Sequence, residues 1–145
     1  MRTIESKAVH SGERNRKRQN RSVTIPIEQT AAYYFENTKQ IKDFYQGKIK
    51  GIKYGRYGCP TQSAVEEKIA ELENADRALL FSSGMSAITT TILSLVKKNQ
   101  HILYTDDCYR NTKKFFDEIL PSFSIESTVV PIDDIGRIKR YTRKN

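Results

Sequence analysis

The segment Arg77-Ala-Leu-Leu-Phe-Ser-Ser-Gly-Met-Ser-Ala87 joins a short apolar run to a turn of small residues and then to a helix. Residues 77–81 are apolar enough for a buried strand. From Met85 onward, the apolar positions Ile88, Ile92 and Leu95 recur at helical spacing. A strand that passes directly into a helix is the first half of a β-α-β unit. The segment therefore predicts an α/β fold.

Downstream of this segment, strands are expected at 101–105 and 127–130, where short apolar runs recur. Between them, residues 112–120 have the pattern of a helix, which Pro121 should end. Strands and helices that alternate with short connections predict a parallel sheet with right-handed crossovers. Such a short sheet leaves its edges open, so the architecture is incomplete.

A helix is also expected upstream of this segment, after Pro60. Ser63 and Glu66 have the spacing of a capping box. Val65, Ile69 and Leu72 then recur on one helical face.

The first fifty residues lack sustained periodicity, which predicts an extended arm with one short helix near 38–45. The aromatic residues 33–35 would be exposed on such an arm, so we expect it to lie on another surface, such as a second subunit. The last ten residues are polar and basic and should be frayed. We therefore divide the chain into an arm at 1–52, a partial α/β domain at 53–135 and a disordered tail at 136–145.

The net charge of +8 belongs to two short segments. Five basic residues fall within 14–21 and five within 137–144, and without these ten, 15 basic residues remain against 17 acidic ones. Such runs are more often solvated arms than binding surfaces. A nucleic-acid-binding protein is disfavoured because no aromatic side chains interleave with these charges.

The cysteine pattern and the absence of long apolar runs indicate the compartment. Cys59 and Cys108 are far apart and form no Cys-x-x-Cys pair, which favours reduced thiols over a disulfide or a metal site. The sequence has no run long enough to cross a bilayer and no segment of signal-peptide type. We expect a cytoplasmic protein that binds neither metal nor membrane.

Three segments carry candidate binding chemistry. The amides that open the helix after Ser83 and Gly84 have no partner within the helix, and with the helix dipole they can bind a phosphate. Tyr54 and Arg56 offer a hydroxyl and a guanidinium fork that suit phosphate oxygens. Tyr109 follows a predicted strand, at the sheet edge where α/β proteins bind ligands, and its ring can stack on a flat cofactor. Taken alone, each segment has a commoner structural explanation as a cap, a loop or a helix start.

Five motifs occur in a characteristic order: Val9-His-Ser-Gly-Glu13, Thr24-Ile-Pro-Ile-Glu-Gln-Thr-Ala31, Tyr54-Gly-Arg-Tyr-Gly-Cys-Pro-Thr61, Phe81-Ser-Ser-Gly-Met-Ser-Ala87 and Asp107-Cys-Tyr-Arg-Asn-Thr112. In this order they resemble the transsulfuration family, the Cys/Met-metabolism group of pyridoxal-phosphate (PLP) enzymes, and most closely its plant-type cystathionine γ-synthase branch. The resemblance covers residues 9 to 134. It implies an incomplete fold-type I PLP-transferase large domain, with a parallel-type sheet and helices after an extended N-terminal arm.

The resemblance also implies roles for single residues. The Gly84 and Met85 amides, with Ser83 beside them, would hold the PLP phosphate, and Tyr109 would stack on the pyridine ring.

Two more roles lie across a subunit boundary. Tyr54 and Arg56 would reach the phosphate of a neighbouring subunit's cofactor, in a homodimer or tetramer that acts on amino-acid substrates. The family usually has asparagine where this chain has Cys59, which puts the geometry of the loop that carries Tyr54 in doubt.

The family's Schiff-base lysine follows a Ser-x-Thr pattern further downstream. The lysines after Tyr109 lack that context; they are Lys113, Lys114, Lys139 and Lys144. Asp133 and Asp134 come too early to be the carboxylate that pairs with the pyridine nitrogen. We therefore expect a truncated cystathionine γ-synthase-like enzyme that has no catalytic residue of its own and is inactive alone. The parent reaction would be γ-replacement on an activated homoserine by cysteine. The alternative is a non-catalytic PLP-binding, phosphate-binding or dimerisation module.

Overall fold

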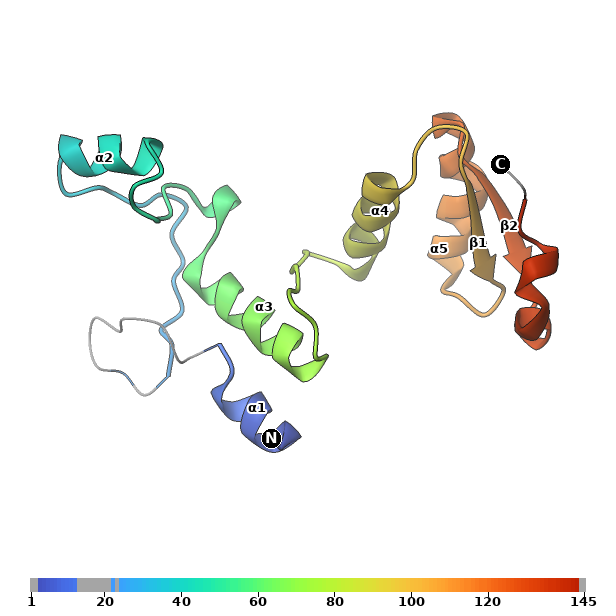
Figure 1. The fold of residues 1–145 in the computed structure, drawn as a ribbon, viewed down its shortest axis with the longest axis horizontal. Coiled ribbons are helices and arrows are strands. Elements are labelled where there is room, and N and C mark those ends of the chain that lie inside the picture. The colour runs from blue at the N-terminus through green and yellow to red at the C-terminus, as the bar shows by residue number, and fades with distance from the viewer. Residues whose placement is uncertain (1–2, 13–21, 23, 144–145) are drawn as a thin grey trace. The chain divides into compact units, whose positions relative to one another are not determined.

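The computed structural model describes residues 3–12, 22 and 24–143 (Figure 1). The chain forms two compact units, Met1–Leu80 and Phe81–Asn145. The domain boundaries expected at 52 and 135 fall inside these units and stay a prediction. Among the helices of the described residues, none combines the length and the apolar character that a membrane span requires.

The first unit contains α1 (Ile4–His10), α2 (Thr38–Tyr45), the short helix η1 (Gly55–Tyr57) and α3 (Pro60–Leu72). The helix α2 lies where the sequence predicts it, and Asn37 caps it by accepting from the Gln40 amide at 2.9 Å. The helix α1 was not expected because its seven residues are too few for a clear periodic pattern.

The expected capping box at Ser63 is wrong. The helix α3 begins three residues earlier, at Pro60, because proline at the first helical position lacks only an N–H that would have no partner there. Ser63 is thus inside the helix, and its amide donates to Cys59 O at 2.9 Å. The Glu66 carboxylate accepts instead from the Leu80 amide at 2.9 Å, which ties the end of this unit back onto α3.

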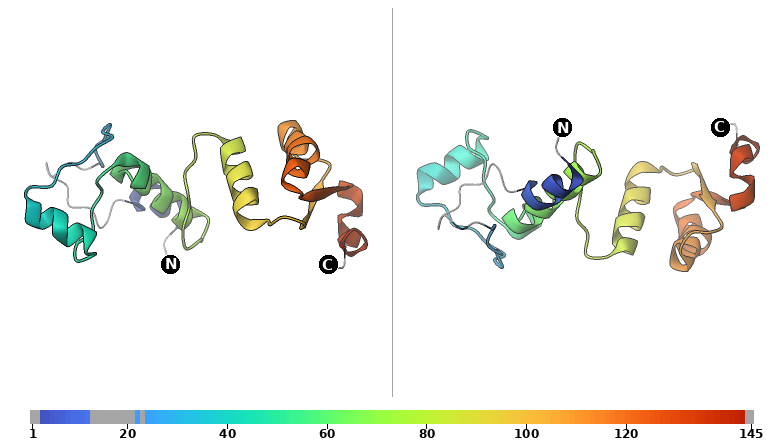
Figure 2. Two further views of the ribbon diagram at one scale, coloured as in Figure 1. Left: turned by 90° about the horizontal axis from the view of Figure 1, so that it is seen from above. Right: turned by 90° about the horizontal axis from the view of Figure 1, so that it is seen from below.

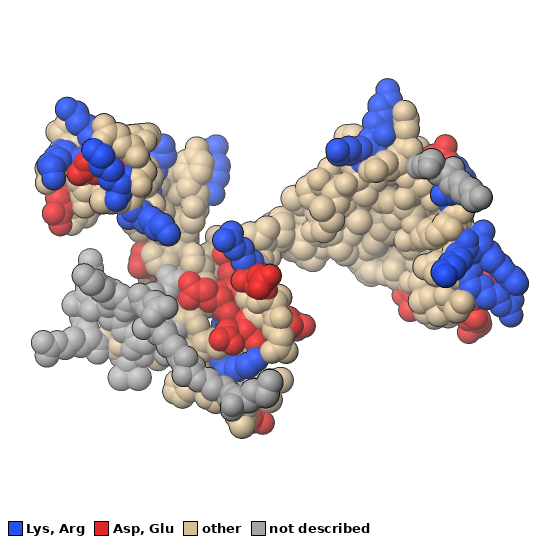
Figure 3. Space-filling model, in the orientation of Figure 1, with Lys and Arg blue, Asp and Glu red and all other residues tan. Residues whose placement is uncertain are grey.

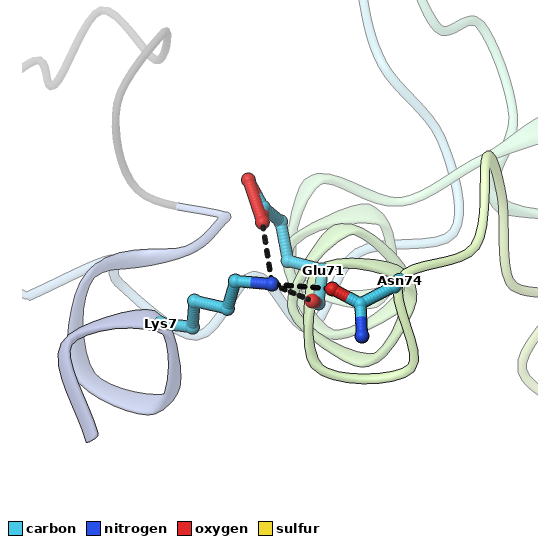
Figure 4. A network of polar contacts seen from close by, with 3 residues as sticks. All are labelled: Lys7, Glu71 and Asn74. Carbon is cyan, nitrogen blue, oxygen red and sulfur yellow. Dashed lines mark hydrogen bonds and ion pairs between the residues drawn. The ribbon is translucent and has the colours of Figure 1, made fainter. Parts of the chain in front are cut away.

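The helices α1 and α3 lie side by side (Figure 2). Lys7 Nζ of α1 donates to Glu71 O at 3.0 Å and to Asn74 Oδ1 at 2.6 Å, and it lies 4.0 Å from a Glu71 carboxylate oxygen (Figure 4). Beyond α1, Gly12 has a φ of +78°, and a Cβ there would lie 2.3 Å from Ala64 O. Glycine is therefore required at this position for the backbone to approach α3 closely.

Lys7→Ala is expected to lower the free energy of unfolding by about 1 kcal/mol, because it removes two hydrogen bonds that hold α1 on α3. The exposed Lys39, 3.7 Å from Asp43 in an i,i+4 pair, is the matched control. Lys39→Ala should cost only about 0.3 kcal/mol. Urea unfolding of both variants, with hydrogen exchange at the α1 amides, measures the difference. Equal effects of the two substitutions would contradict the role given to Lys7.

The second unit contains the helices α4 (Gly84–Leu95) and α5 (Arg110–Lys114) and the strands β1 (His101–Thr105) and β2 (Glu126–Val130). A short π-helix, η2 (Phe115–Ile119), and a 3₁₀-helix, η3 (Leu120–Phe123), follow α5, and a second 3₁₀-helix, η4 (Ile132–Arg140), follows β2. The strands β1 and β2 pair in parallel, with His101 opposite Glu126 and Thr105 opposite Val130. The predicted strands at 101–105 and 127–130 and the parallel pairing are confirmed. The α5–η2–η3 segment lies beside the sheet in Figure 1.

The strand expected at 77–81 is wrong. These residues have no regular secondary structure, no described strand pairs with them, and Leu79 is 77% exposed. An apolar run indicates that its side chains are buried, whereas a strand also needs a neighbouring strand that pairs with its backbone N–H and C=O groups. The helix expected at 112–120 begins at Arg110, and Pro121 does not end it, because the chain continues through η3 to Ser124 with its φ of +57°.

The core of the second unit is one aromatic and aliphatic cluster. Phe115, Phe116, Leu120 and Ile125 are buried in it. Parts of α4 and β1 pack against this cluster through Met85, Ile92, Val96, Ile102 and Tyr104. Tyr104 Oη donates to Asp117 at 2.8 Å, and burial together with this carboxylate raises the pKa of Tyr104 to about 12. The core thereby holds α4, the α5–η2 segment and the sheet in one arrangement.

The C-terminal residues differ from the frayed tail that the sequence favours. Residues 136–140 belong to η4, and Tyr141 Oη donates to Asp134 at 2.6 Å. Arg143 pairs with Glu126 at the start of β2. Lysine and arginine side chains gather over this part of the chain (Figure 3).

Candidate functional site

Ser83 caps the helix α4. Its backbone is extended, and its Oγ accepts from the Ser86 amide at 3.0 Å. The Ser83 carbonyl accepts from the Ala87 amide at 3.1 Å. Because a serine hydroxyl also carries a proton, Ser83 can still donate to a ligand while it caps the helix.

The Gly84 and Met85 amides are the two that remain at the start of α4. Within residues 3–12, 22 and 24–143, neither donates a hydrogen bond. A Cβ built at Gly84 meets nothing within 4 Å, so the space in front of this turn is open. Two unpaired amides at the positive end of a 12-residue helix make a site that suits an anion.

The first turns of α4 and α5 are in contact. Thr112, which is buried in α5, donates from Oγ1 to the Met85 sulfur at 3.6 Å. Tyr109 caps α5 three residues earlier and is 63% exposed. Asn111 Nδ2 donates to Tyr109 Oη at 3.1 Å. The structure therefore brings Ser83, Gly84 and Met85 to the same end of this unit as Tyr109.

The loop from β1 to α5 is fixed to the end of β2. The Asp106 amide donates to Val130 O at 3.1 Å, and Asp106 Oδ1 accepts from the Ile132 amide at 2.9 Å. The Cys108 amide donates to Thr105 O at 3.3 Å. Tyr109 is thus carried by an ordered loop at the carboxyl ends of both strands, the edge where parallel sheets bind ligands.

Tyr54 and Arg56 lie in the first unit. The chain around Tyr54 pairs with the arm, because the Gly55 amide donates to Ala31 O at 2.8 Å and the Tyr33 amide to Lys53 O at 3.1 Å. The Arg56 guanidinium lies 5.4 Å from the centre of the Tyr54 ring, and both side chains are exposed. The structure brings these two residues together with each other.

Lys53 also belongs to this loop, although it lies just outside the motif that begins at Tyr54. Its Nζ lies 4.8 Å from the centre of the Tyr45 ring and 5.3 Å from that of Tyr57, and it donates to Tyr45 Oη at 3.1 Å. The alternation of basic and aromatic residues in 53–57 is the signal that could have indicated it.

Cys59 is half-buried at the N-cap of α3. The backbone amides of Gln62 and Thr61 lower the pKa of its thiol, and burial only partly opposes them. Its sulfur lies 3.7 Å from Glu28 O of the arm. Tyr33 lies beside it, and burial raises the pKa of Tyr33 to about 12. Cys59 therefore contacts both the arm and α3, at the end of the loop that carries Tyr54.

Cys59 is expected to react with iodoacetamide with a pH midpoint below that of a free cysteine peptide measured alongside. The thiolate is the nucleophile, and a lowered pKa keeps the thiolate populated at lower pH. The reaction stops once the pH falls below that pKa and the thiolate is protonated. A Cys108→Ser background leaves Cys59 as the one thiol to follow by mass spectrometry. A midpoint at or above that of the peptide would show that the α3 amides do not act on this sulfur.

Comparison with known proteins places these features in a family. The family model described as Cys/Met metabolism PLP-dependent enzyme matches residues 5–145. The chain is 42% identical, over 135 residues, to cystathionine gamma-synthase 1, chloroplastic, of Nicotiana tabacum. That match covers 92% of this chain and 25% of the tobacco protein, so the chain spans about a quarter of the length of this relative.

Solved structures agree with this match. The metB protein of Corynebacterium glutamicum has a TM-score of 0.86 and 26% identity, over 100% of this chain and 36% of that one. A structure from Campylobacter jejuni subsp. jejuni NCTC 11168 contains N'-pyridoxyl-lysine-5'-monophosphate and has a TM-score of 0.84 and 25% identity. This match covers 99% of this chain and 35% of the Campylobacter chain. The expected fold class, the α/β fold of PLP-dependent fold-type I enzymes, is confirmed. With its five ordered motifs, its parallel sheet and this family match, the chain belongs to the Cys/Met metabolism family of PLP-dependent enzymes.

Proposed function

We propose that this chain carries the phosphate-binding part of a cystathionine γ-synthase-like PLP enzyme of methionine and cysteine metabolism, and that it is inactive by itself. The observation that carries the proposal is the pair of unpaired amides at Gly84 and Met85, joined through the Met85–Thr112 contact to the helix that Tyr109 caps. The identity to the tobacco cystathionine gamma-synthase supports the synthase branch.

The residues of the second unit fit the phosphate end of PLP. The Gly84 and Met85 amides would donate to phosphate oxygens, and the Ser83 hydroxyl would add a third donor. The exposed ring of Tyr109 would cover one face of the pyridine ring and exclude water from it. When bound, PLP supplies an electron sink for the bonds at the α-carbon of an amino-acid substrate.

The proposed parent reaction is γ-replacement, in which the sulfur of cysteine displaces the activated oxygen of a homoserine ester to give cystathionine. A PLP enzyme needs a lysine that bonds to the cofactor and moves protons on the substrate. In this chain, Lys113 and Lys114 belong to α5, and Lys114 lies 3.7 Å from Glu118. Neither follows a Ser-x-Thr pattern, which supports the proposed lack of turnover.

Tyr54 and Arg56 are proposed to act across a subunit interface, on the phosphate bound by a second copy in a homodimer or tetramer. Their joint exposure and their mutual contact support this role, since together they present a hydroxyl and a guanidinium to solvent. The alternative function, a non-catalytic PLP-binding or dimerisation module, rests on the same residues. For location we propose the cytoplasm, a compartment that suits two free thiols.

The test is to mix the purified chain with PLP and then supply cysteine with an activated homoserine. We expect saturable PLP binding that inorganic phosphate competes away. Cystathionine should form no faster than it does with free PLP alone. Turnover that disappears when one specific lysine is replaced would overturn the proposed inactivity. Absence of PLP binding would overturn the proposed phosphate site.

A further inference from the structure

A cavity of about 330 Å³ lies in the first unit, against one face of α3. Its volume is at the lower end of the range for pockets that hold small molecules, roughly 300–1,000 Å³. Most of its lining is apolar and comes from Ile25 of the arm and from Ala64, Val65, Ile69 and Leu72 of α3. No residue proposed above to bind PLP is among the described residues that line it.

Ser11, the residue after α1, is a buried polar residue of this cavity. It is 5% exposed, and its amide donates to Lys7 O at 3.0 Å. Among the residues that the structure describes, none forms a hydrogen bond with the Ser11 hydroxyl. A buried hydroxyl without a partner costs free energy, and a polar atom of a ligand in the cavity would supply one. Ser11 therefore indicates a ligand that carries a polar group as well as an apolar body.

Lys68 gives the cavity its charge. In the described part of the chain, Lys68 has no ion-pair partner, and no acidic residue lines the cavity. Thr61, which also lines it, accepts at Oγ1 from the Glu28 amide at 2.9 Å, and its hydroxyl proton remains available to donate. A carboxylate in the cavity would thus meet an ammonium and two hydroxyl donors, and hydrogen bonds of this charge-assisted kind are the strong ones.

We propose that this cavity is a second ligand site, separate from the proposed PLP site, and that it binds a small carboxylate with a short apolar chain. The apolar chain would lie on Ile25, Val65 and Ile69, and the carboxylate would accept from Ser11 and Lys68. A cation would be repelled by Lys68, and an uncharged molecule would leave the ammonium unpaired. Because the cavity is lined by the arm, by the end of α1 and by α3, an occupant would hold these three segments together.

The test is an NMR titration of the labelled full-length chain with hexanoate and three related probes. Acetate lacks the apolar chain, 1-hexanol lacks the charge, and hexylamine carries the opposite charge. We expect the amide signals of Val65, Lys68 and Ile69 to shift saturably with hexanoate, with a Kd of about 1 mM. Acetate and 1-hexanol should bind more weakly by about tenfold or more, and hexylamine should not bind.

Lys68→Met removes the ammonium and keeps an unbranched side chain of similar length. It should weaken hexanoate binding about tenfold and leave 1-hexanol binding unchanged, a split that a folding defect would not produce. Ser11→Ala should weaken hexanoate binding about threefold. Lys42→Met, at an exposed position of α2, is the matched control and should leave the binding of both probes unchanged.

Three outcomes would overturn the proposal. One is the absence of a saturable shift with hexanoate in the unmodified chain. Another is equal hexanoate binding by the Lys68→Met and Lys42→Met variants. The third is that hexanoate shifts the Gly84 and Met85 signals in place of those of α3. Inorganic phosphate should shift only the Gly84 and Met85 signals, so failure at this cavity is distinguishable from failure at the proposed PLP site.

Discussion

Leu120→Ala should lower the free energy of unfolding of the chain by about 3 kcal/mol. Leu120 is 0% exposed and belongs to the cluster of Phe115, Phe116 and Ile125 that joins α4 to the sheet. Its truncation would leave a cavity that these aromatic rings cannot fill without losing their contacts with Met85 and Tyr104.

The matched control is Leu95→Ala at the end of α4, where the side chain is 72% exposed. This substitution should change the free energy of unfolding by less than about 0.5 kcal/mol. Urea unfolding of the full-length variants, followed by circular dichroism, compares the two. Similar losses for both would mean that the cluster around Leu120 is not the core of the second unit.

Gly84→Asp should weaken binding of both PLP and inorganic phosphate about tenfold or more, without loss of stability. A carboxylate at the first position of α4 would occupy the open space in front of the amides and repel a dianion. Stability should be unchanged or slightly higher, because a Cβ meets nothing there and an acidic residue suits a helix N-terminus.

Gly136→Asp controls for the added negative charge. Gly136 also has nothing within 4 Å of a built Cβ, but it lies in η4, away from the start of α4 in the sequence. Isothermal titration of both variants with phosphate and with PLP gives the comparison. If Gly136→Asp weakened binding as much as Gly84→Asp, the effect would come from net charge and not from the α4 turn.

The elements that the sequence predicts correctly are those that local patterns determine. The helix α2 has an Asn cap and a clear start, and β1 and β2 are short apolar runs between polar turns. The run at 77–81 looks the same in sequence, yet it forms no strand, because pairing depends on a neighbour that a local pattern does not contain. The short helices α1 and η4 escape prediction because the seven residues of α1 are too few for a clear periodic pattern and a kink at Arg137 interrupts η4.

The candidate site divides in the same way. The position of Tyr109 follows from the order of β1 and α5, which places it at the carboxyl end of a parallel strand. The turn at Ser83 and Gly84 follows from the start of α4, because the strand expected before it does not form. The Met85–Thr112 contact that joins them depends on side-chain packing and has no sequence signal. The proposed role of Tyr54 and Arg56 involves a second copy, so it lies beyond what the pattern of one chain can specify.

The central claim is that the unpaired amides at the start of α4 bind the phosphate of PLP. Amide NMR spectra of the labelled full-length chain test it most directly, during separate titrations with PLP, inorganic phosphate and pyridoxal. We predict that the Gly84 and Met85 amide signals shift with PLP and with phosphate, and that pyridoxal, which lacks the phosphate, leaves them in place. Unmoved Gly84 and Met85 signals in a chain that binds PLP, or equal shifts with pyridoxal, would contradict the claim.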